Sequence, residues 1–145
     1  DADSDSDVDT ALYGYRGEAT VVSGATYSGW EEFYATNGGT DYCVYRWDAV
    51  QTAVLSTCSD CDWAFTVEMT ANSYITNIDS GCPAESDLSA TADYDYGTGV
   101  YSYGGTDYQV LKYGYAGTWY NVAMATWDDS TGAFTYDWPL GSGYL

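Results

Sequence analysis

The chain contains no histidine and only three basic residues, and both shortages exclude large classes of function. Without histidine, a Ser-His-Asp or Cys-His nucleophilic site and a histidine-ligated metal centre are impossible. Arg16, Arg46 and Lys112 stand against 22 acidic residues, which gives a net charge of −19. Such a chain repels phosphate backbones and anionic lipid headgroups, so nucleic acid and anionic membrane surfaces are excluded as partners. Cations are its natural small partners.

Long apolar runs, glycosylation sequons and prolines are also missing or scarce. No run of about 18 apolar residues is present, so we expect no membrane span. The Asn-X-Ser/Thr sequon does not occur, so N-linked glycans are not expected. The chain has two prolines, Pro83 and Pro139, and helical periodicity is absent over any useful length. We therefore expect no substantial helix.

Period-2 alternation is what the chain has instead. In "DWAFTVEMT", Trp63, Phe65, Val67 and Met69 share one face, which is typical of a half-buried strand. Glycine-rich turn signals separate such runs, and 17 tyrosines suit pleated, half-exposed surfaces. We expect an all-β fold, an antiparallel sandwich or barrel of roughly nine strands. The expected strands lie near residues 11–22, 26–36, 41–48, 51–57, 62–70, 87–95, 99–115 (a hairpin), 118–127 and 132–139.

The length of 145 residues suits one domain, which we place at residues 11–145 after an acidic extension at residues 1–10. Four cysteines, Cys43, Cys58, Cys61 and Cys82, favour two disulfides over a zinc site, because Cys58-X-X-Cys61 has no second close Cys or His pair. Two disulfides indicate an oxidising compartment, so we expect a secreted or cell-surface protein whose export signal has been removed. Three pairings are possible, and we expect Cys58 and Cys61 each to reach outward, to Cys43 and Cys82 in some order.

The opening "DADSDSDVDT" places aspartate at every odd position. Alternate carboxylates are how calcium loops present hard oxygen ligands, although the glycine and the later glutamate of an EF-hand are absent. We expect a looser calcium site, completed by carboxylates elsewhere; the alternative is a solvated acidic spacer. The candidate ligands are Asp1, Asp3, Asp5, Asp7 and Asp9.

The same stretch and the residues after it also alternate as a strand. Val8, Thr10 and Leu12 share one face, and Tyr13 and Tyr15 share the other. This strand can pair within its own domain or add to a groove of a neighbouring copy. A head-to-tail contact of the second kind does not close, so it builds a filament.

Carboxylate pairs are the remaining candidates for catalysis, since a glycosidase needs two carboxylates across a cleft. In a chain this acidic such pairs arise by chance, and adjacent strand residues point to opposite faces, so we predict that the protein is not an enzyme. Asp128 to Gly132 is expected to be a hairpin turn, with a surface calcium site as a minor option. The candidate pairs are Glu31/Glu32, Asp93/Asp95 and Asp128/Asp129.

Aromatic side chains are candidates for stacking on sugars. The alternative is that tyrosine-rich faces pack against another protein copy, as at interface centres. Trp47 and Trp63 are expected in the core instead. The sugar-stacking candidates are Trp30, Trp119, Trp127, Trp138 and the tyrosines between residues 94 and 103.

The stretch "YCVYRWDAV…CSDCDWAFTVEMT…GC", about residues 43–82, resembles acidic exported domains of Gram-negative bacteria, often lipoproteins of predatory or gliding lineages. The resemblance implies the compartment and the disulfides, and no activity. The N-terminal strand is similar in architecture to filament subunits that assemble by donor-strand exchange.

These observations together predict a structural subunit of an extracellular filament or surface assembly. It would polymerise with copies of itself through the N-terminal strand, and disulfides and calcium would stabilise it. The alternative is a monomeric secreted module that binds glycans or another protein.

Overall fold

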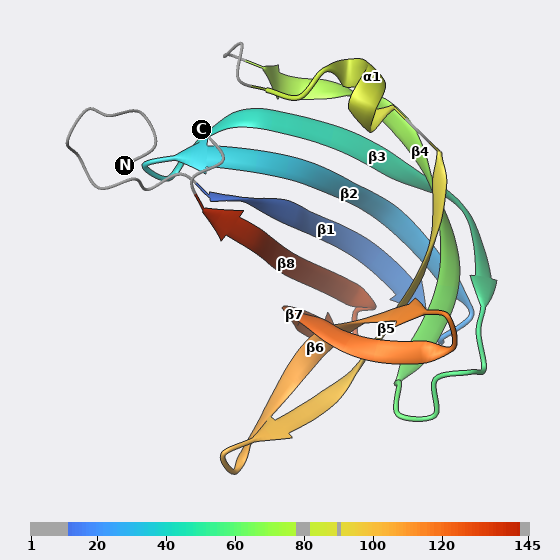
Figure 1. Cartoon of the computed structure of the whole chain (residues 1–145). Coiled ribbons are helices and arrows are strands. Elements are labelled where there is room, and N and C mark those ends of the chain that lie inside the picture. Colours follow the sequence, from blue (N-terminus) through green and yellow to red (C-terminus); the bar gives the residue numbers. More distant parts are fainter. Residues whose placement is uncertain (1–11, 78–81, 90, 143–145) are drawn as a thin grey trace.

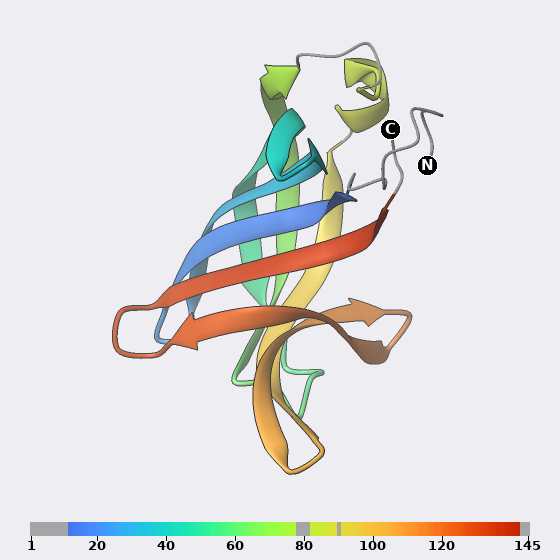
Figure 2. The same ribbon diagram turned by 90° about the vertical axis from the view of Figure 1, so that its left-hand side faces the viewer.

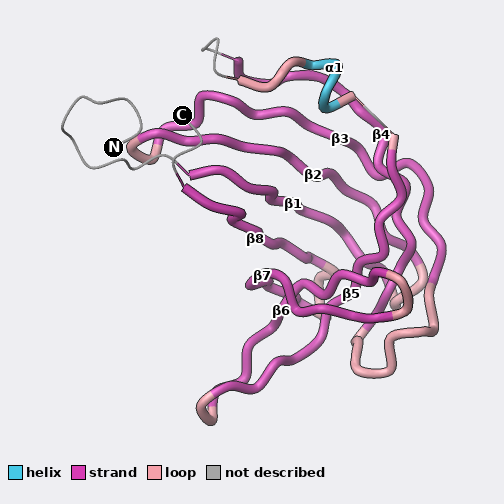
Figure 3. Tube along the Cα trace, in the orientation of Figure 1, coloured by secondary structure: helices cyan, strands magenta, loops and turns pink. Residues whose placement is uncertain are grey.

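The computed structural model describes residues 12–77, 82–89 and 91–142, and these form a closed antiparallel barrel of eight strands (Figures 1 and 3). Neighbouring strands in the barrel follow one another along the chain, and β1 pairs with β8 to close it. The all-β prediction is confirmed, and of sandwich and barrel the fold is the barrel. The elements are β1 (Leu12–Val22), β2 (Thr26–Asn37), β3 (Thr40–Val54), β4 (Trp63–Asn77), α1 (Glu85–Leu88), β5 (Ala92–Tyr103), β6 (Thr106–Tyr115), β7 (Thr118–Asp128) and β8 (Ala133–Ser142).

Two strands expected near residues 41–48 and 51–57 are one strand, β3. Its register against β4 shifts at three places, one of them between Ala49 and Gln51. A bulge adds a residue without ending the strand, so the alternation in the sequence breaks although the pairing continues. The strand expected near residues 87–95 begins later, at Ala92, because α1 covers Glu85–Leu88. It also continues to Tyr103 as β5, so it includes the first arm of the hairpin expected at residues 99–115. None of the described helical residues forms a helix long and apolar enough to cross a membrane.

Tight glycine turns connect most neighbouring strands. Gly38 and Gly39 join β2 to β3, and Gly104 and Gly105 join β5 to β6, all with positive φ. Two consecutive left-handed residues match the twist of the strands that they connect. The β5–β6 hairpin extends beyond the rest of the barrel (Figure 2), and Tyr103 next to its turn is 69 % exposed.

Aromatic side chains fill the barrel interior. Trp63 packs edge-to-face on Phe134 at 4.7 Å and on Tyr27 at 5.8 Å between ring centroids. Phe65, Phe134 and Leu111 are fully buried. Trp47 and Trp63 belong to this core, as expected. Burial of these large apolar side chains is the main favourable term in folding.

The four cysteines form two disulfides, but the expected pairing is wrong. Cys43 of β3 pairs with Cys82, which precedes α1, and Cys58 pairs with Cys61 within the loop before β4. That loop turns back on itself, and the Cys61 N–H donates to the Cys58 carbonyl, so the two Cα atoms are only 5.5 Å apart. This separation lies in the normal range for a disulfide.

Candidate binding site

The predicted calcium ligands Asp1, Asp3, Asp5, Asp7 and Asp9, and the predicted strand residues Val8 and Thr10, lie outside the described residues. Leu12, Tyr13 and Tyr15 lie in β1, where each pairs with β2 on one side and β8 on the other. The calcium site and the intersubunit strand therefore stay predictions. Within the described ranges, no group of three or more acidic or cysteine side chains is arranged to hold a metal ion.

The candidate carboxylate pairs do not face each other across a cleft. Glu31 points into the barrel and Glu32 points outward, although each residue is only 4 % exposed. Asp95 accepts a hydrogen bond from Thr66 on the neighbouring strand. Asp128 accepts hydrogen bonds from the backbone N–H and hydroxyl of Ser130, which lower its pKa and form the expected turn.

A row of four charged side chains, continued by a methionine, crosses the outer face of the barrel. Arg46, Glu32, Arg16, Asp137 and Met124 lie directly opposite one another on β3, β2, β1, β8 and β7. Glu32 accepts from both arginines, at 3.0 Å from Arg16 Nε and 2.5 Å from an Arg46 terminal nitrogen. This row fixes the outer face because each guanidinium makes charge-assisted hydrogen bonds.

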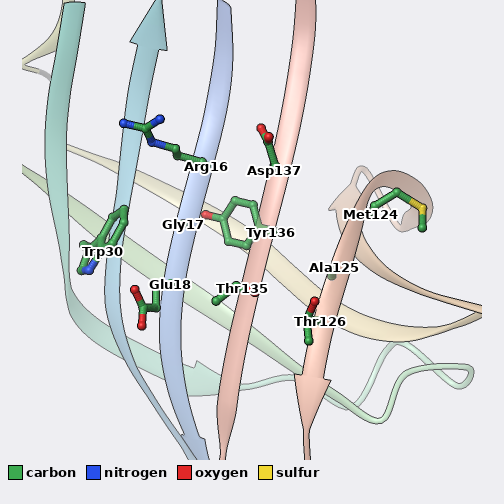
Figure 4. A pocket seen from close by; sticks show the side chains of 10 residues that line it. All are labelled: Arg16, Gly17, Glu18, Trp30, Met124, Ala125, Thr126, Thr135, Tyr136 and Asp137. Atoms are coloured by element: carbon green, nitrogen blue, oxygen red, sulfur yellow. The ribbon is translucent and has the colours of Figure 1, made fainter. Parts of the chain in front are cut away.

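A second row lies two residues further along each strand, on the same outer face, and it lines an open groove of about 520 Å³. Figure 4 shows the side chains of Trp30, Glu18, Thr135 and Thr126 placed across β2, β1, β8 and β7, with Arg16 and Asp137 at one edge. Neighbouring strands lie about 4.8 Å apart, so four strands span roughly 14 Å. The groove thus combines one indole, carboxylates and two hydroxyls along an extended surface.

Two cation–π contacts hold the aromatic side chains beside this groove in place. The Arg46 guanidinium lies 4.1 Å from the centroid of Trp30, and that of Arg16 lies 4.9 Å from the centroid of Tyr34. The Tyr34 hydroxyl donates to Asp137 at 2.7 Å. Burial, followed by this bond to Asp137, raises the Tyr34 pKa well above its usual value, so the hydroxyl stays a donor. The indole and the carboxylate are therefore preorganised before a ligand arrives.

The groove continues into a more apolar hollow of about 790 Å³. Met124 and Asp137 line both, so the two form one continuous surface. Tyr101 and Tyr120, which are 42 % and 49 % exposed, stand in the second part. We call this combined surface the outer groove; it has Trp30 in its polar part and two tyrosines in its apolar part.

Behind the outer groove, the barrel interior holds a buried carboxyl group. Tyr96 and Tyr136 donate their hydroxyls to the same Glu31 oxygen, at 2.6 and 2.5 Å. Desolvation raises the pKa of Glu31, and these two bonds oppose that rise. Tyr136 reaches Glu31 by lying over Gly17 of β1, where a Cβ would overlap its ring. The cluster therefore ties β2, β5 and β8 together across the interior.

The tryptophans that were candidates for sugar stacking lie in different parts of the structure. Trp30 lies in the outer groove, whereas Trp138 packs inside the barrel against Tyr15 at 6.2 Å. Trp119 lies over Gly114 beside it in the sheet, and Trp127 lies at the end of β7. The polar residues around Trp30 are not apparent from the sequence, because only the strand register places them beside it. Those residues are Arg16, Glu18, Thr126, Thr135 and Asp137.

Comparison with known proteins adds no relative. No family model, curated protein or solved structure matches this chain.

Proposed function

We propose that the protein is a glycan-binding module, and that an extended, uncharged sugar chain lies in the outer groove across β2, β1, β8 and β7. The observation that carries this proposal is the row of Trp30, Glu18, Thr135 and Thr126 on four adjacent strands. The proposal concerns binding and involves no catalytic step.

The chemistry of the row matches that of a sugar ring. A pyranose presents a patch of C–H bonds that packs on an aromatic face, and hydroxyls that donate to carboxylates and exchange hydrogen bonds with threonine hydroxyls. Trp30 would supply the ring face that Arg46 does not cover, while Glu18 and Asp137 would supply acceptors. An anionic glycan is disfavoured, because the protein carries a net charge of −19 and Arg16 is already paired with Glu32 and Asp41.

The length of the outer groove favours a chain of several rings over a single sugar. Its apolar part adds Tyr101 and Tyr120, so aromatic side chains lie in both parts of one continuous surface. Binding sites for small molecules usually enclose most of the ligand, whereas this surface is open along its length. The two disulfides are compatible with an extracellular setting, where polysaccharides are abundant partners.

An array of neutral oligosaccharides, followed by calorimetric titration of the best ligand, tests the proposal. Trp30→Ala should weaken binding about tenfold or more, because a tryptophan contact often carries a large share of the affinity of a site. Tyr115→Ala is the matched control, since Tyr115 is 66 % exposed and does not line the outer groove. Equal affinities of the Trp30→Ala variant and the parent, or no ligand on the array, would refute the proposal.

A further inference from the structure

A second pocket lies at one end of the barrel, apart from the outer groove. Its lining comes from the β1–β2 turn, the start of β4, and the end of β7 with the turn that follows it, and it has a volume of about 510 Å³. Strands in this barrel alternate in direction, so these three segments meet at the same end, and Figure 2 shows the β1–β2 and β7–β8 turns side by side there. We call it the end pocket, and its lining residues are Ser23, Gly24, Asp62, Trp63, Trp127 and Asp129.

We infer that the end pocket binds a hexosamine with a free ammonium group, as in a deacetylated amino sugar. Asp62 and Asp129 would hold the ammonium, and Trp127 would pack against the C–H face of the ring. This site goes beyond the proposed glycan groove and shares no residue with it.

The charge of the end pocket selects a cation. Two carboxylates line it and no basic residue does. All three basic residues of the chain are engaged elsewhere: both arginines bind Glu32, and Lys112 donates to Asn121 at 2.9 Å. An ammonium has three N–H donors for the two carboxylates and the Ser23 hydroxyl.

The aromatic walls select an organic cation over a metal ion. Trp127 and Trp63 meet edge-to-face, with ring centroids 5.8 Å apart, and Trp127 is half-buried. Calcium requires six to eight oxygen ligands, and the indoles occupy much of the wall that would have to supply them. An indole also attracts an ammonium through its π face and packs well on a sugar ring.

Trp63, which lines the end pocket, also carries a buried donor without a partner among the described residues. Trp63 lines the pocket and is 5 % exposed, and its Nε1 has no hydrogen-bond partner within the described residues. Leaving such a group unpaired away from water is unfavourable, because its desolvation is not compensated. The accessible area of Nε1 is below 1 Å², so a hexosamine hydroxyl would pair with it only where the indole edge opens toward the pocket, and a simple alkylammonium has no hydroxyl to offer.

Both carboxylates stand on segments that other contacts hold in place. The Asp62 backbone N–H donates to Thr98, and its carboxylate accepts from Gln109 at 3.1 Å. The Cys58–Cys61 disulfide lies directly before Asp62, and Cys61 sits against Gly97 of β5. Asp129 belongs to the turn that Asp128 fixes. The end pocket is therefore largely preformed, which lowers the entropic cost of binding.

Titration with three probes tests this inference, with the indole N–H signals in two-dimensional NMR spectra as the readout. The probes are glucosamine at a pH where its amine is protonated, N-acetylglucosamine, which lacks the charge, and ethanolamine, which lacks the ring. We expect glucosamine to bind about tenfold more tightly than either of the others, because each control loses one group of contacts. Equal affinity of glucosamine and N-acetylglucosamine would overturn the role of the carboxylates, and equal affinity of ethanolamine would overturn recognition of the ring.

Matched charge variants locate the site. Asp129→Asn should weaken glucosamine binding about tenfold, whereas Asp107→Asn, which removes the same charge beside the β5–β6 turn, should leave it unchanged. Asp129 is exposed in a turn, so the variant is expected to fold, and thermal melting checks this. An equal loss in both variants would reduce the effect to general charge attraction and overturn the inference. Glucosamine binding that survives Asp129→Asn but is lost in Trp30→Ala would place the amine in the outer groove and overturn the inference, while leaving the proposed glycan function intact.

Discussion

Glu31 and Glu32 are neighbours in β2 and equally buried, yet the protein accommodates them in opposite ways. Glu31 faces the interior, where two tyrosine hydroxyls donate to it and no basic side chain among the described residues forms an ion pair with it. Glu32 faces outward, where two arginines bind it. The pKa of Glu31 is raised, mainly because burial penalises its charged form.

The difference shows how a very acidic chain distributes its few cations. Both arginines bind the outward Glu32, and Arg16 also binds Asp41. Their guanidinium groups also lie over Trp30 in the outer groove and over Tyr34 next to it. The interior carboxyl has to rely on neutral donors, which cost less to bury than a paired charge. The outer cluster, which consists of Glu32, Arg16 and Arg46, thus organises a surface. The inner cluster, which consists of Glu31, Tyr96 and Tyr136, joins three strands.

Removing the two tyrosine hydroxyls that donate to Glu31 should have the largest effect on stability. Tyr96→Phe combined with Tyr136→Phe should lower the free energy of unfolding by about 3 kcal/mol, because hydrogen bonds to a carboxylate contribute about 1.5–3 kcal/mol each. Chemical denaturation measures this loss. Tyr103→Phe, at the exposed hairpin tip, is the control and should change little. A loss below that of a typical surface substitution would mean that the inner cluster contributes nothing to stability.

Breaking the outer cluster should cost less. Glu32→Gln should lower the free energy of unfolding by about 2 kcal/mol, below the roughly 3–5 kcal/mol of a fully buried pair, because the arginine side chains are about one-third exposed. The loss should shrink at high salt, unlike that of the tyrosine variant. Glu18→Gln removes a charge from the same face without touching the arginine pairs, and an equal loss there would contradict the assignment.

A smaller effect on stability is expected for a substitution next to the outer groove, and it tests ligand binding as well. Tyr34→Phe removes the hydrogen bond to Asp137 and should lower the free energy of unfolding by about 1 kcal/mol. Glycan affinity should fall as well, because Asp137 lines the outer groove and loses its fixed position. Parallel denaturation and titration experiments measure both effects. Unchanged glycan affinity would show that Asp137 does not act in binding.

The smallest loss is expected for Glu31→Gln, and it should depend on pH. The raised pKa means that the folded state holds the proton more tightly than the unfolded state, so the parent protein loses stability as pH rises from the unfolded pKa toward the folded one. The amide of the variant can still accept from the tyrosines but cannot ionise. The stability of the variant relative to the parent should therefore increase with pH over this window. Parallel pH profiles would show that Glu31 has no shifted pKa.

The same two residues show how far the sequence could predict the site. Alternation along the strand already placed Glu31 and Glu32 on opposite faces, and it placed Trp63 and Trp47 in the core. It could not say which face was interior in β2, because both carry a glutamate. The aromatic character of Trp30 indicated a sugar-stacking residue, but nothing in the sequence indicated Glu18 and Thr135. Their place beside Trp30 depends on the register of β1 against β2 and β8, and β8 is distant from β1 in sequence.

The sequence by itself determined the class of fold and the charge, since alternation with period two, paired glycines in turns and a shortage of basic residues are local or compositional properties. The tertiary structure decided the closure of β8 on β1, the pairing of Cys58 with Cys61, and the rows of side chains across the outer face. The physical reason is that strand pairing is non-local. One residue of register exchanges the inner and outer faces of a strand, and only packing of the complete barrel fixes that choice.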